Sequence, residues 1–188
     1  MIIHKHKCIF THIPKCGGSS IYQSLSGSEA YSNHNRLPKD LNDQTKNYFK
    51  FTFTRNPWDR FISNYFYFKK YGRDKWDAKM GEIVNRYNSF KDFALNFNNI
   101  PEGDWIYGHF KEQSLWATEN HDFTGRFERL QEDFNVVCDK IGIPPQQLPH
   151  KNKSNHKHYT EYYDDETRDA VAKKYAKDIE YFGHKFAD

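Results

Sequence analysis

A short segment with two adjacent glycines constrains the fold of this 188-residue chain more than any other feature. Residues 13–20 read Ile-Pro-Lys-Cys-Gly-Gly-Ser-Ser, and an apolar run at residues 8–10 precedes them. Apolar side chains at helical spacing, Ile21 and Leu25, follow directly. This order predicts a β-strand, a tight loop and the first turns of a helix.

The predicted loop carries the groups of an anion-binding site. Gly17 and Gly18 let the backbone turn tightly and approach a ligand, and Ser19 or Ser20 is expected to cap the helix. Backbone amides at a helix N-terminus bind anions, and Lys15 adds a positive charge. A phosphate or sulfate group is therefore the expected ligand. An ordinary turn with a solvated lysine is the alternative, because the usual phosphate loop places its lysine after the glycines.

A second strand-to-helix turn supports the anion-binding interpretation. Aromatic residues at 48–53 predict a β-strand, and Arg55 lies at its carboxyl end. Asn56 is expected to cap the next helix, in which Pro57 takes the first position. Ser63 lies off the apolar stripe of that helix. Because ligands collect beyond the carboxyl ends of strands in open α/β sheets, the two turns suit a ligand with two separated anionic groups.

Together the two turns resemble those of carbohydrate-modifying sulfotransferases, the Golgi-type family 2 relatives that use 3′-phosphoadenosine 5′-phosphosulfate (PAPS). Residues 13–20 resemble the family's 5′-phosphosulfate loop, and residues 54–63 resemble its 3′-phosphate motif. Residues 125–134, 148–154 and 159–186 also match. The resemblance therefore covers nearly the whole chain.

The resemblance implies binding residues for PAPS and for its product, 3′-phosphoadenosine 5′-phosphate (PAP). Arg55 and Ser63 would bind the 3′-phosphate. A basic loop at residues 150–158 would lie near the cofactor or an acidic acceptor through Lys153 and Ser154, although a solvated loop is the alternative. The residues expected to hold the 5′ end are Lys15, Cys16, Gly17, Gly18, Ser19 and Ser20.

Two residues are expected to act in catalysis. Sulfuryl transfer, like phosphoryl transfer, moves a group in line between two oxygens, so the enzyme mainly positions groups and neutralises charge. Lys15 would stabilise the sulfate and the leaving 5′-phosphate oxygen. His34 is the first choice of general base, because related enzymes use a histidine between the two cofactor motifs. A solvated surface histidine is the alternative there, and His12, His109 and Glu128 are the other candidates.

The leading hypothesis is a PAPS-dependent sulfotransferase that acts on a hydroxyl group, most readily that of a carbohydrate. The runner-up is a nucleotide-dependent phosphotransferase, which the position of Lys15 and the lack of an evident acidic magnesium site disfavour. A non-catalytic module that binds PAP or another nucleotide is the third candidate. No metal is expected, and the net charge of only +3 disfavours nucleic acid as a partner. Acceptor identity and oligomeric state stay open.

Strands that alternate with helices favour one α/β domain over residues 1–188, with helices on both faces of a mainly parallel sheet. The resemblance implies a P-loop-like nucleotide-binding architecture of three layers. Aromatic residues make up 18% of the chain and are expected to supply much of the core. Further expected elements are a helix capped by Ser89, a strand at 123–127, a helix at 130–141 and a final helix that Asp164 or Asp165 caps and that continues to residue 182.

The cysteines and the N-terminal residues suggest a cytoplasmic protein. Cys8 and Cys138 fall on predicted apolar faces and are expected to be buried, reduced thiols, whereas Cys16 is expected to fill the loop rather than act as a nucleophile. His4, His6 and Cys8 alternate and would share one face of a strand, but no second ligand pair accompanies them. No signal-peptide core or membrane-spanning run is visible, so a cytoplasmic location is expected.

Overall fold

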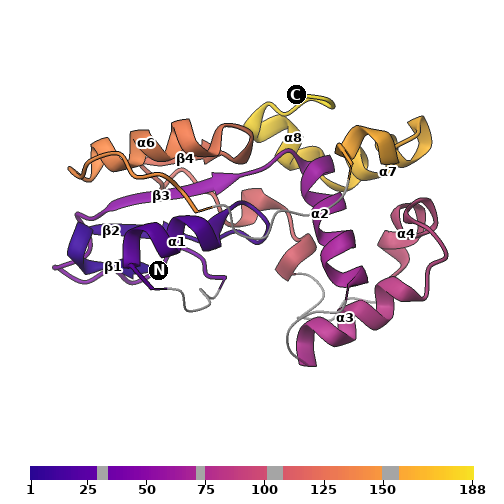
Figure 1. Cartoon of the computed structure of the whole chain (residues 1–188), viewed down its shortest axis with the longest axis horizontal. Coiled ribbons are helices and arrows are strands. Elements are labelled where there is room, and N and C mark those ends of the chain that lie inside the picture. The colour runs from indigo at the N-terminus through magenta and orange to yellow at the C-terminus, as the bar shows by residue number, and fades with distance from the viewer. Residues whose placement is uncertain (29–33, 71–74, 101–107, 150–156) are drawn as a thin grey trace. The chain divides into compact units, whose positions relative to one another are not determined.

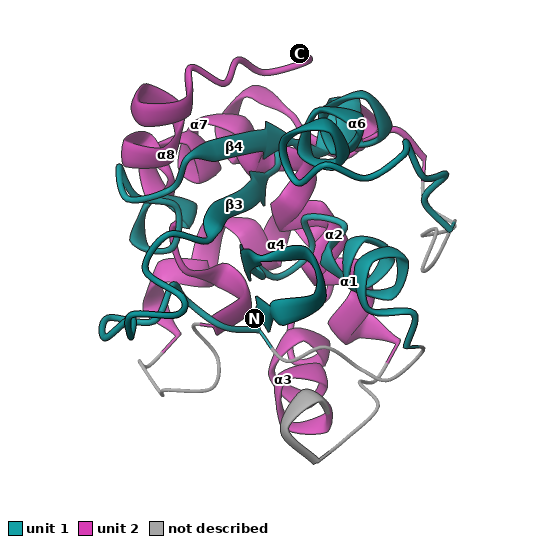
Figure 2. Ribbon diagram, turned by 90° about the vertical axis from the view of Figure 1, so that its left-hand side faces the viewer, with its two compact units in different colours: residues 1–55, 113–153 teal, residues 56–112, 154–188 magenta. Residues whose placement is uncertain are grey.

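The computed structural model describes residues 1–28, 34–70, 75–100, 108–149 and 157–188, with the backbone alone at 75–77. The chain forms two compact units (Figure 2). Unit 1 comprises Met1–Arg55 and Gln113–Lys153, and unit 2 comprises Asn56–Glu112 and Ser154–Asp188. That residues 1–188 act as one domain stays a prediction.

Unit 1 is an α/β unit built on a four-stranded sheet (Figure 1). The strands lie in the order β1-β2-β3-β4, in which β1 pairs antiparallel and the other pairs are parallel. Helix α6 packs beside β4. The expected α/β class with a mainly parallel sheet is confirmed. The elements are β1 (Ile2–Ile3), β2 (Cys8–Thr11), α1 (Gly18–Ser26), β3 (Phe49–Thr54), β4 (Phe123–Arg126) and α6 (Leu130–Lys140), with the short 3-10 helices η1 (His4–His6), η3 (Gln113–Leu115) and η4 (Phe127–Arg129).

The strand register brings the two predicted turns to one edge of the sheet. Thr11 at the end of β2 pairs with Thr52, and Thr54 at the end of β3 pairs with Arg126 at the end of β4. Because parallel strands end at the same edge, the segments that follow β2, β3 and β4 all start there. This is the edge at which ligands bind in open α/β sheets.

The predicted alternation of His4, His6 and Cys8 along one strand is wrong. His4–His6 form the 3-10 helix η1, which ends at Lys7 in the left-handed conformation (φ 48°). Cys8 starts β2 and is buried, and Cys138 is buried on α6, as expected. Burial raises the pKa of the Cys8 thiol to about 12, so that thiol stays protonated and unreactive at neutral pH.

Unit 2 is helical in its described part. Helix α2 packs against α3, α7 and the 3-10 helix η5 (Tyr159–Tyr162), and α4 packs against α7. The predicted caps of α2 and α4 are confirmed, because Asn56 accepts from the amide of Trp58 at 3.1 Å and Ser89 accepts from that of Asp92 at 3.1 Å. The helices are α2 (Pro57–Lys69), α3 (Lys75–Asn85), α4 (Phe90–Asn96), α7 (Asp165–Lys174) and α8 (Ala176–Phe182), with a further 3-10 turn η2 at Phe97–Asn99.

Aromatic rings make the core of unit 2. Phe61 on α2 is buried, and its ring lies 5.3 to 6.2 Å, centroid to centroid, from several other rings. Edge-to-face and tilted contacts of this kind stabilise beyond the area that they bury, by about 0.5–1.5 kcal/mol per pair. The partner rings are Phe90, Phe93, Phe97, Phe110 and Tyr175.

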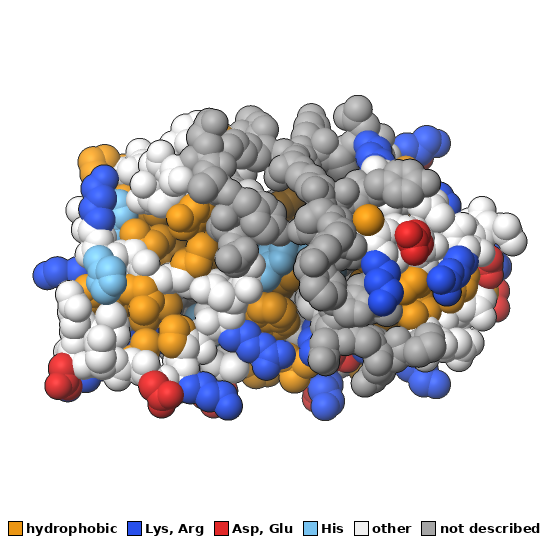
Figure 3. Space-filling view, turned by 90° about the horizontal axis from the view of Figure 1, so that it is seen from below, with side chains coloured by type: hydrophobic (Ala, Val, Ile, Leu, Met, Phe, Trp, Pro, Cys, Tyr) orange, Lys and Arg blue, Asp and Glu red, His pale blue; other side chains and the backbone are white. Residues whose placement is uncertain are grey.

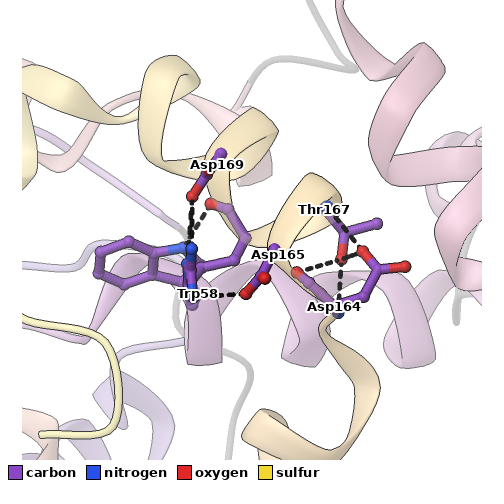
Figure 4. Close-up of polar contacts among 6 residues, drawn as sticks. Trp58, Asp164, Asp165, Thr167 and Asp169 are labelled. Atoms are coloured by element: carbon purple, nitrogen blue, oxygen red, sulfur yellow. Dashed lines mark hydrogen bonds and ion pairs between the residues drawn. The ribbon is translucent and has the colours of Figure 1, made fainter.

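The C-terminal helix starts as expected but ends early. Asp164 and Thr167 form a reciprocal capping box at the start of α7 (Figure 4). Beside it, the Trp58 indole donates to the Arg168 carbonyl at 2.9 Å. The predicted continuous helix is wrong, because Tyr175 leaves helical geometry (ψ 27°) between α7 and α8. The buried Tyr175 hydroxyl donates to the Phe110 carbonyl at 2.8 Å, a long-range contact that helical periodicity does not predict.

No helix in the described ranges has both the length and the apolar character needed to cross a membrane.

Candidate functional site

The loop between β2 and α1 has an unusual backbone at its lysine. Lys15 adopts a left-handed conformation with φ 67°, which residues with a side chain rarely take. Nη1 of Arg55 donates to the Lys15 carbonyl oxygen at 3.0 Å. Local strain of this kind persists where surrounding contacts hold it, and it gathers at functional sites. The two basic residues predicted to bind one ligand therefore lie together.

Helix α1 starts without a side-chain cap, so the predicted caps at Ser19 or Ser20 are wrong. The helix begins at Gly18, and Gly17 takes the N-cap position with φ 79°. Gly17 provides no side-chain cap for the first amides, and the first turn carries no acidic residue. Uncapped amides and the positive end of the helix dipole favour a bound anion. The left-handed glycine supplies the turn that the serine cap was expected to supply.

The two loop glycines are required by packing inside unit 1. A Cβ added at Gly18 would lie 2.0 Å from Cδ2 of His12 and 2.2 Å from its Nε2. One added at Gly17 would lie 2.8 Å from a methyl carbon of Leu130. Both distances are too short for real contacts, so glycine lets the loop sit against these side chains. The same contacts hold the loop in place for a ligand.

The side chain of Arg55 contacts the Lys15 carbonyl and the Phe127 ring within unit 1. Its side chain is only 7% exposed, and its guanidinium carbon lies 4.0 Å from the centre of the Phe127 ring. A guanidinium over an aromatic face gains a cation–π attraction of roughly 0.5–2 kcal/mol. The guanidinium carries five N–H donors in a fixed fork, a geometry that matches the oxygens of a phosphate.

Gln113 is a site residue that sequence reasoning missed. Its side chain is fully buried, its Oε1 accepts from the Arg55 amide at 2.8 Å, and its Nε2 donates to the Arg55 carbonyl at 2.8 Å. Cys16 also donates through Sγ to Gln113 Oε1 at 3.3 Å. Cys16 is thus a buried thiol that packs within the loop, as expected. No local pattern marks Gln113, because its partners lie far away in the sequence.

His34 lies beside the loop, in contact with a second histidine. The His34 and His12 rings are 4.6 Å apart, centroid to centroid, and nearly edge to face. The His12 amide donates to the Asn35 carbonyl at 3.1 Å, which pins the His34 segment to the end of β2. His12 is 3% exposed and stacks on Phe10, which suits the structural role that its strand position suggested. His34 is half-buried, and its role as general base stays a prediction.

His109 and Glu128 are the other candidates for the general base. His109 belongs to unit 2, where its Nδ1 hydrogen-bonds with Oδ1 of Asn64 at 3.2 Å and its ring stacks on Tyr67. Glu128 is exposed on η4 of unit 1. That His34 is the general base, in preference to these two residues, stays a prediction.

The structure does not test three of the predicted cofactor residues. Ser63 lies on α2 of unit 2 and is 5% exposed, and its pairing with Arg55 stays a prediction. Lys153 and Ser154 lie outside the described residues. Within the described ranges, no group of three or more His, Cys, Asp or Glu side chains could hold a metal ion.

Comparisons with known proteins identify relatives of this chain. The chain is 32% identical over 120 residues to an uncharacterized protein of Archaeoglobus fulgidus, covering 61% of this chain and 82% of that one. It is 24% identical to human carbohydrate sulfotransferase 9, covering 93% of this chain and 47% of the relative. It is 23% identical to zebrafish (Danio rerio) carbohydrate sulfotransferase 14, and the match covers 77% of this chain and 48% of the relative.

The chain thus spans about half the length of the two named sulfotransferases. No solved structure matches it. A family model described as "Sulfotransferase family" matches residues 1–185, nearly the whole chain. With the glycine loop, the uncapped helix and the adjoining arginine in place, the chain belongs to the sulfotransferase family.

Proposed function

We propose that this protein transfers a sulfuryl group from PAPS to a hydroxyl group of a carbohydrate. The observation that carries the proposal is the hydrogen bond from Arg55 to the Lys15 carbonyl, at the sheet edge where both turns begin. Family membership supports sulfuryl transfer, and the loop supplies the charges that such a donor needs.

The residues of unit 1 fit the anionic ends of the donor. The uncapped amides at the start of α1 would bind the 5′-phosphate, with a dipole contribution of about 0.3–1 kcal/mol per charge at an exposed site. Lys15, which is partly exposed, would neutralise the sulfate. Arg55 would take the 3′-phosphate in a bidentate grip. Ser63, Lys153 and Ser154 are proposed as further donor contacts on the strength of the resemblance.

Lys15 has the central catalytic role in this proposal. As the acceptor oxygen bonds to sulfur, the bond from sulfur to the 5′-phosphate oxygen breaks and negative charge builds on that oxygen. The ammonium group of Lys15 would stabilise this charge, and PAP would leave with both phosphates. Preorganised donors of this kind typically contribute 10²–10³-fold to the rate, as a rough guide.

His34 is proposed as the group that takes the proton from the acceptor hydroxyl. Its ring contacts His12, which is itself packed against Gly18 of the loop. A general base within reach of the hydroxyl contributes typically about 10²–10⁴-fold. The acceptor would therefore enter on the side of the loop where His34 lies.

A carbohydrate acceptor is proposed because two similar proteins are named carbohydrate sulfotransferases. On the face that Figure 3 shows, the Lys and Arg side chains of the described residues are scattered, and Asp and Glu side chains lie near several of them. Scattered basic residues and a net charge of +3 suit a small anionic donor better than a long polyanion.

Nucleotide binding and group transfer test the proposal together. PAP is expected to raise the melting temperature far more than 5′-AMP does, because only PAP carries a 3′-phosphate. Protein incubated with sulfur-labelled PAPS and a panel of sugars, lipid headgroups and phenols should label a sugar. Equal shifts with PAP and 5′-AMP would contradict the 3′-phosphate assignment, and magnesium-dependent consumption of ATP would favour a phosphotransferase instead.

A further inference from the structure

The side-chain amide of Gln113 hydrogen-bonds with both backbone groups of Arg55, as the backbone of a neighbouring strand would. The register of β3 with β4 ends at Thr54, and that of β3 with β2 ends at Thr52. The Arg55 amide and carbonyl lie beyond both ladders, and the side-chain amide of Gln113 bonds to each of them at 2.8 Å. A buried backbone group without a partner costs about 1–3 kcal/mol, so this pair of bonds fixes where the chain turns.

The orientation of the Gln113 amide follows from its partners. The Arg55 N–H can only donate, so Oε1 must face it, and the Arg55 carbonyl can only accept, so Nε2 must face that group. Sγ of Cys16 adds a weak third bond to Oε1 from inside the Lys15 loop. One fully buried side chain therefore joins the backbone of Arg55 to the loop that Arg55 also contacts through its guanidinium.

We propose that Gln113 is a positioning residue for recognition of the 3′-phosphate. Gln113 holds the Arg55 backbone so that its guanidinium contacts the Lys15 carbonyl and the Phe127 ring, a position from which it would bind the phosphate. Gln113 itself touches no ligand in this scheme. The inference rests on the proposed function, because it takes PAP and PAPS as the ligands.

Affinities for PAP and for 5′-AMP, measured by titration calorimetry, test this role. Gln113→Ala should weaken PAP binding about tenfold, which is about 1.4 kcal/mol of binding free energy, because the Arg55 backbone would no longer be held by its two bonds to Gln113. The affinity of the same variant for 5′-AMP should differ from that of the wild type by less than about threefold. In an Arg55→Ala background, Gln113→Ala should have no further effect on the ratio of the two affinities, because the residue acts through Arg55.

A matched control separates positioning from general stability. Gln131 also uses its side-chain amide to hold backbone in unit 1: its Nε2 donates to the Gln146 carbonyl at 3.0 Å and its Oε1 accepts from the Leu148 amide at 2.9 Å. Gln131→Ala should lower the melting temperature and leave the ratio of PAP to 5′-AMP affinity unchanged. If Gln113→Ala does not fold, Gln113→Glu keeps the acceptor for the Arg55 amide and loses the donor, and it should lose PAP affinity selectively.

The outcomes are distinguishable. A wild-type protein that binds PAP and 5′-AMP equally contradicts the proposed function and removes the ligand that this inference requires. A wild type that prefers PAP, with a Gln113→Ala or Gln113→Glu variant that keeps that preference, overturns the role of Gln113 alone. Equal effects of Gln113→Ala with and without Arg55 would overturn it as well.

Discussion

The guanidinium of Arg55 donates from Nη1 to the carbonyl oxygen of Lys15 at 3.0 Å, across 40 positions of sequence. This bond joins the turn after β3 to the glycine loop after β2. Lys15 has a left-handed backbone and accepts this bond at its carbonyl, so the contact links the guanidinium of Arg55 to the backbone of the loop. The predictions below follow from this arrangement and its neighbours.

Arg55→Lys should remove most of the preference for PAP over 5′-AMP. Lysine keeps the charge but lacks the planar fork, so it cannot bond to Lys15 and a phosphate in the same way or stack on Phe127. We expect PAP affinity, measured by calorimetry, to fall roughly 10–100-fold. This is the effect expected when a hydrogen bond to a charged group, worth about 1.5–3 kcal/mol, is lost. Arg86→Lys, at an exposed arginine of unit 2, is the control and should bind PAP as the wild type does. An Arg55→Lys variant with full PAP preference would show that the arginine fork is not used.

Lys15→Ala should abolish most sulfuryl transfer while the protein stays folded. The expected loss of turnover is about 10²–10³-fold, typical of removing a preorganised donor from a transition state. Single-turnover transfer from labelled PAPS measures it. Lys46→Ala is the control. Lys46 is an exposed lysine of the same unit, and its ammonium group forms an ion pair with the exposed Asp43 at 2.8 Å. Unchanged turnover in Lys15→Ala would place the catalytic charge elsewhere.

Gly18→Ala should destabilise unit 1 through His12. The added Cβ would lie 2.0 Å from the His12 ring, so the buried ring or the helix start must move. The expected cost is roughly 1–3 kcal/mol of unfolding free energy, as for overpacking elsewhere, measured by urea denaturation. Gly108→Ala is the control, since a Cβ there meets no atom within 4 Å. Adding His12→Ala to Gly18→Ala should reduce the effect of the alanine at 18, and an undiminished effect would contradict the clash.

The stability of unit 1 should fall in mild acid because of His121. Burial lowers the pKa of His121 below its ordinary 6.5; weaker influences from Thr118 and Asp122 raise it, and Lys50 lowers it. In the fold its Nε2 hydrogen-bonds with Oγ1 of Thr11 at 2.8 Å. The unfolded chain therefore binds a proton at His121 more readily than the folded chain does. The contribution of neutral His121 to the free energy of unfolding is complete above pH 6.5, and it is lost as the pH falls from 6.5 through the lowered pKa of the folded state.

Urea denaturation between pH 5 and 8 measures the effect, because this window brackets the ordinary pKa of histidine. His121→Gln, which keeps a side-chain N–H, should flatten the acid limb of the stability curve. His158→Gln, at an exposed histidine, should leave the curve unchanged. An acid limb that persists in His121→Gln would assign the dependence to another group.

Much of the fold could be predicted from neighbouring residues in the sequence. Strand β3, the Asn56 cap and the glycine loop depend on side chains a few positions apart, and those predictions are confirmed. The break at Tyr175 could not be predicted, because it accompanies a hydroxyl bond to a carbonyl 65 positions away. The role of Gln113 was missed for the same reason, since its bonds to Arg55 span 58 positions.

The local geometry of the candidate site differs from what the sequence predicted. The Arg55 guanidinium contacts the Lys15 carbonyl, and the binding of one ligand by both residues stays a prediction. The serine cap was wrong because a left-handed Gly17 ends the loop and leaves the first amides of α1 without a side-chain cap. Such amides favour an anion more than capped ones would.

Transfer of labelled sulfuryl from PAPS to a sugar hydroxyl, in wild type and Lys15→Ala side by side, tests the central claim most directly. Wild-type protein should move label from PAPS to at least one carbohydrate in the panel and release PAP in equal amount. Lys15→Ala should still bind PAP and lose nearly all transfer. PAPS left intact by the wild type with every hydroxyl acceptor, or equal transfer by Lys15→Ala, would contradict a sulfotransferase whose catalytic charge is Lys15.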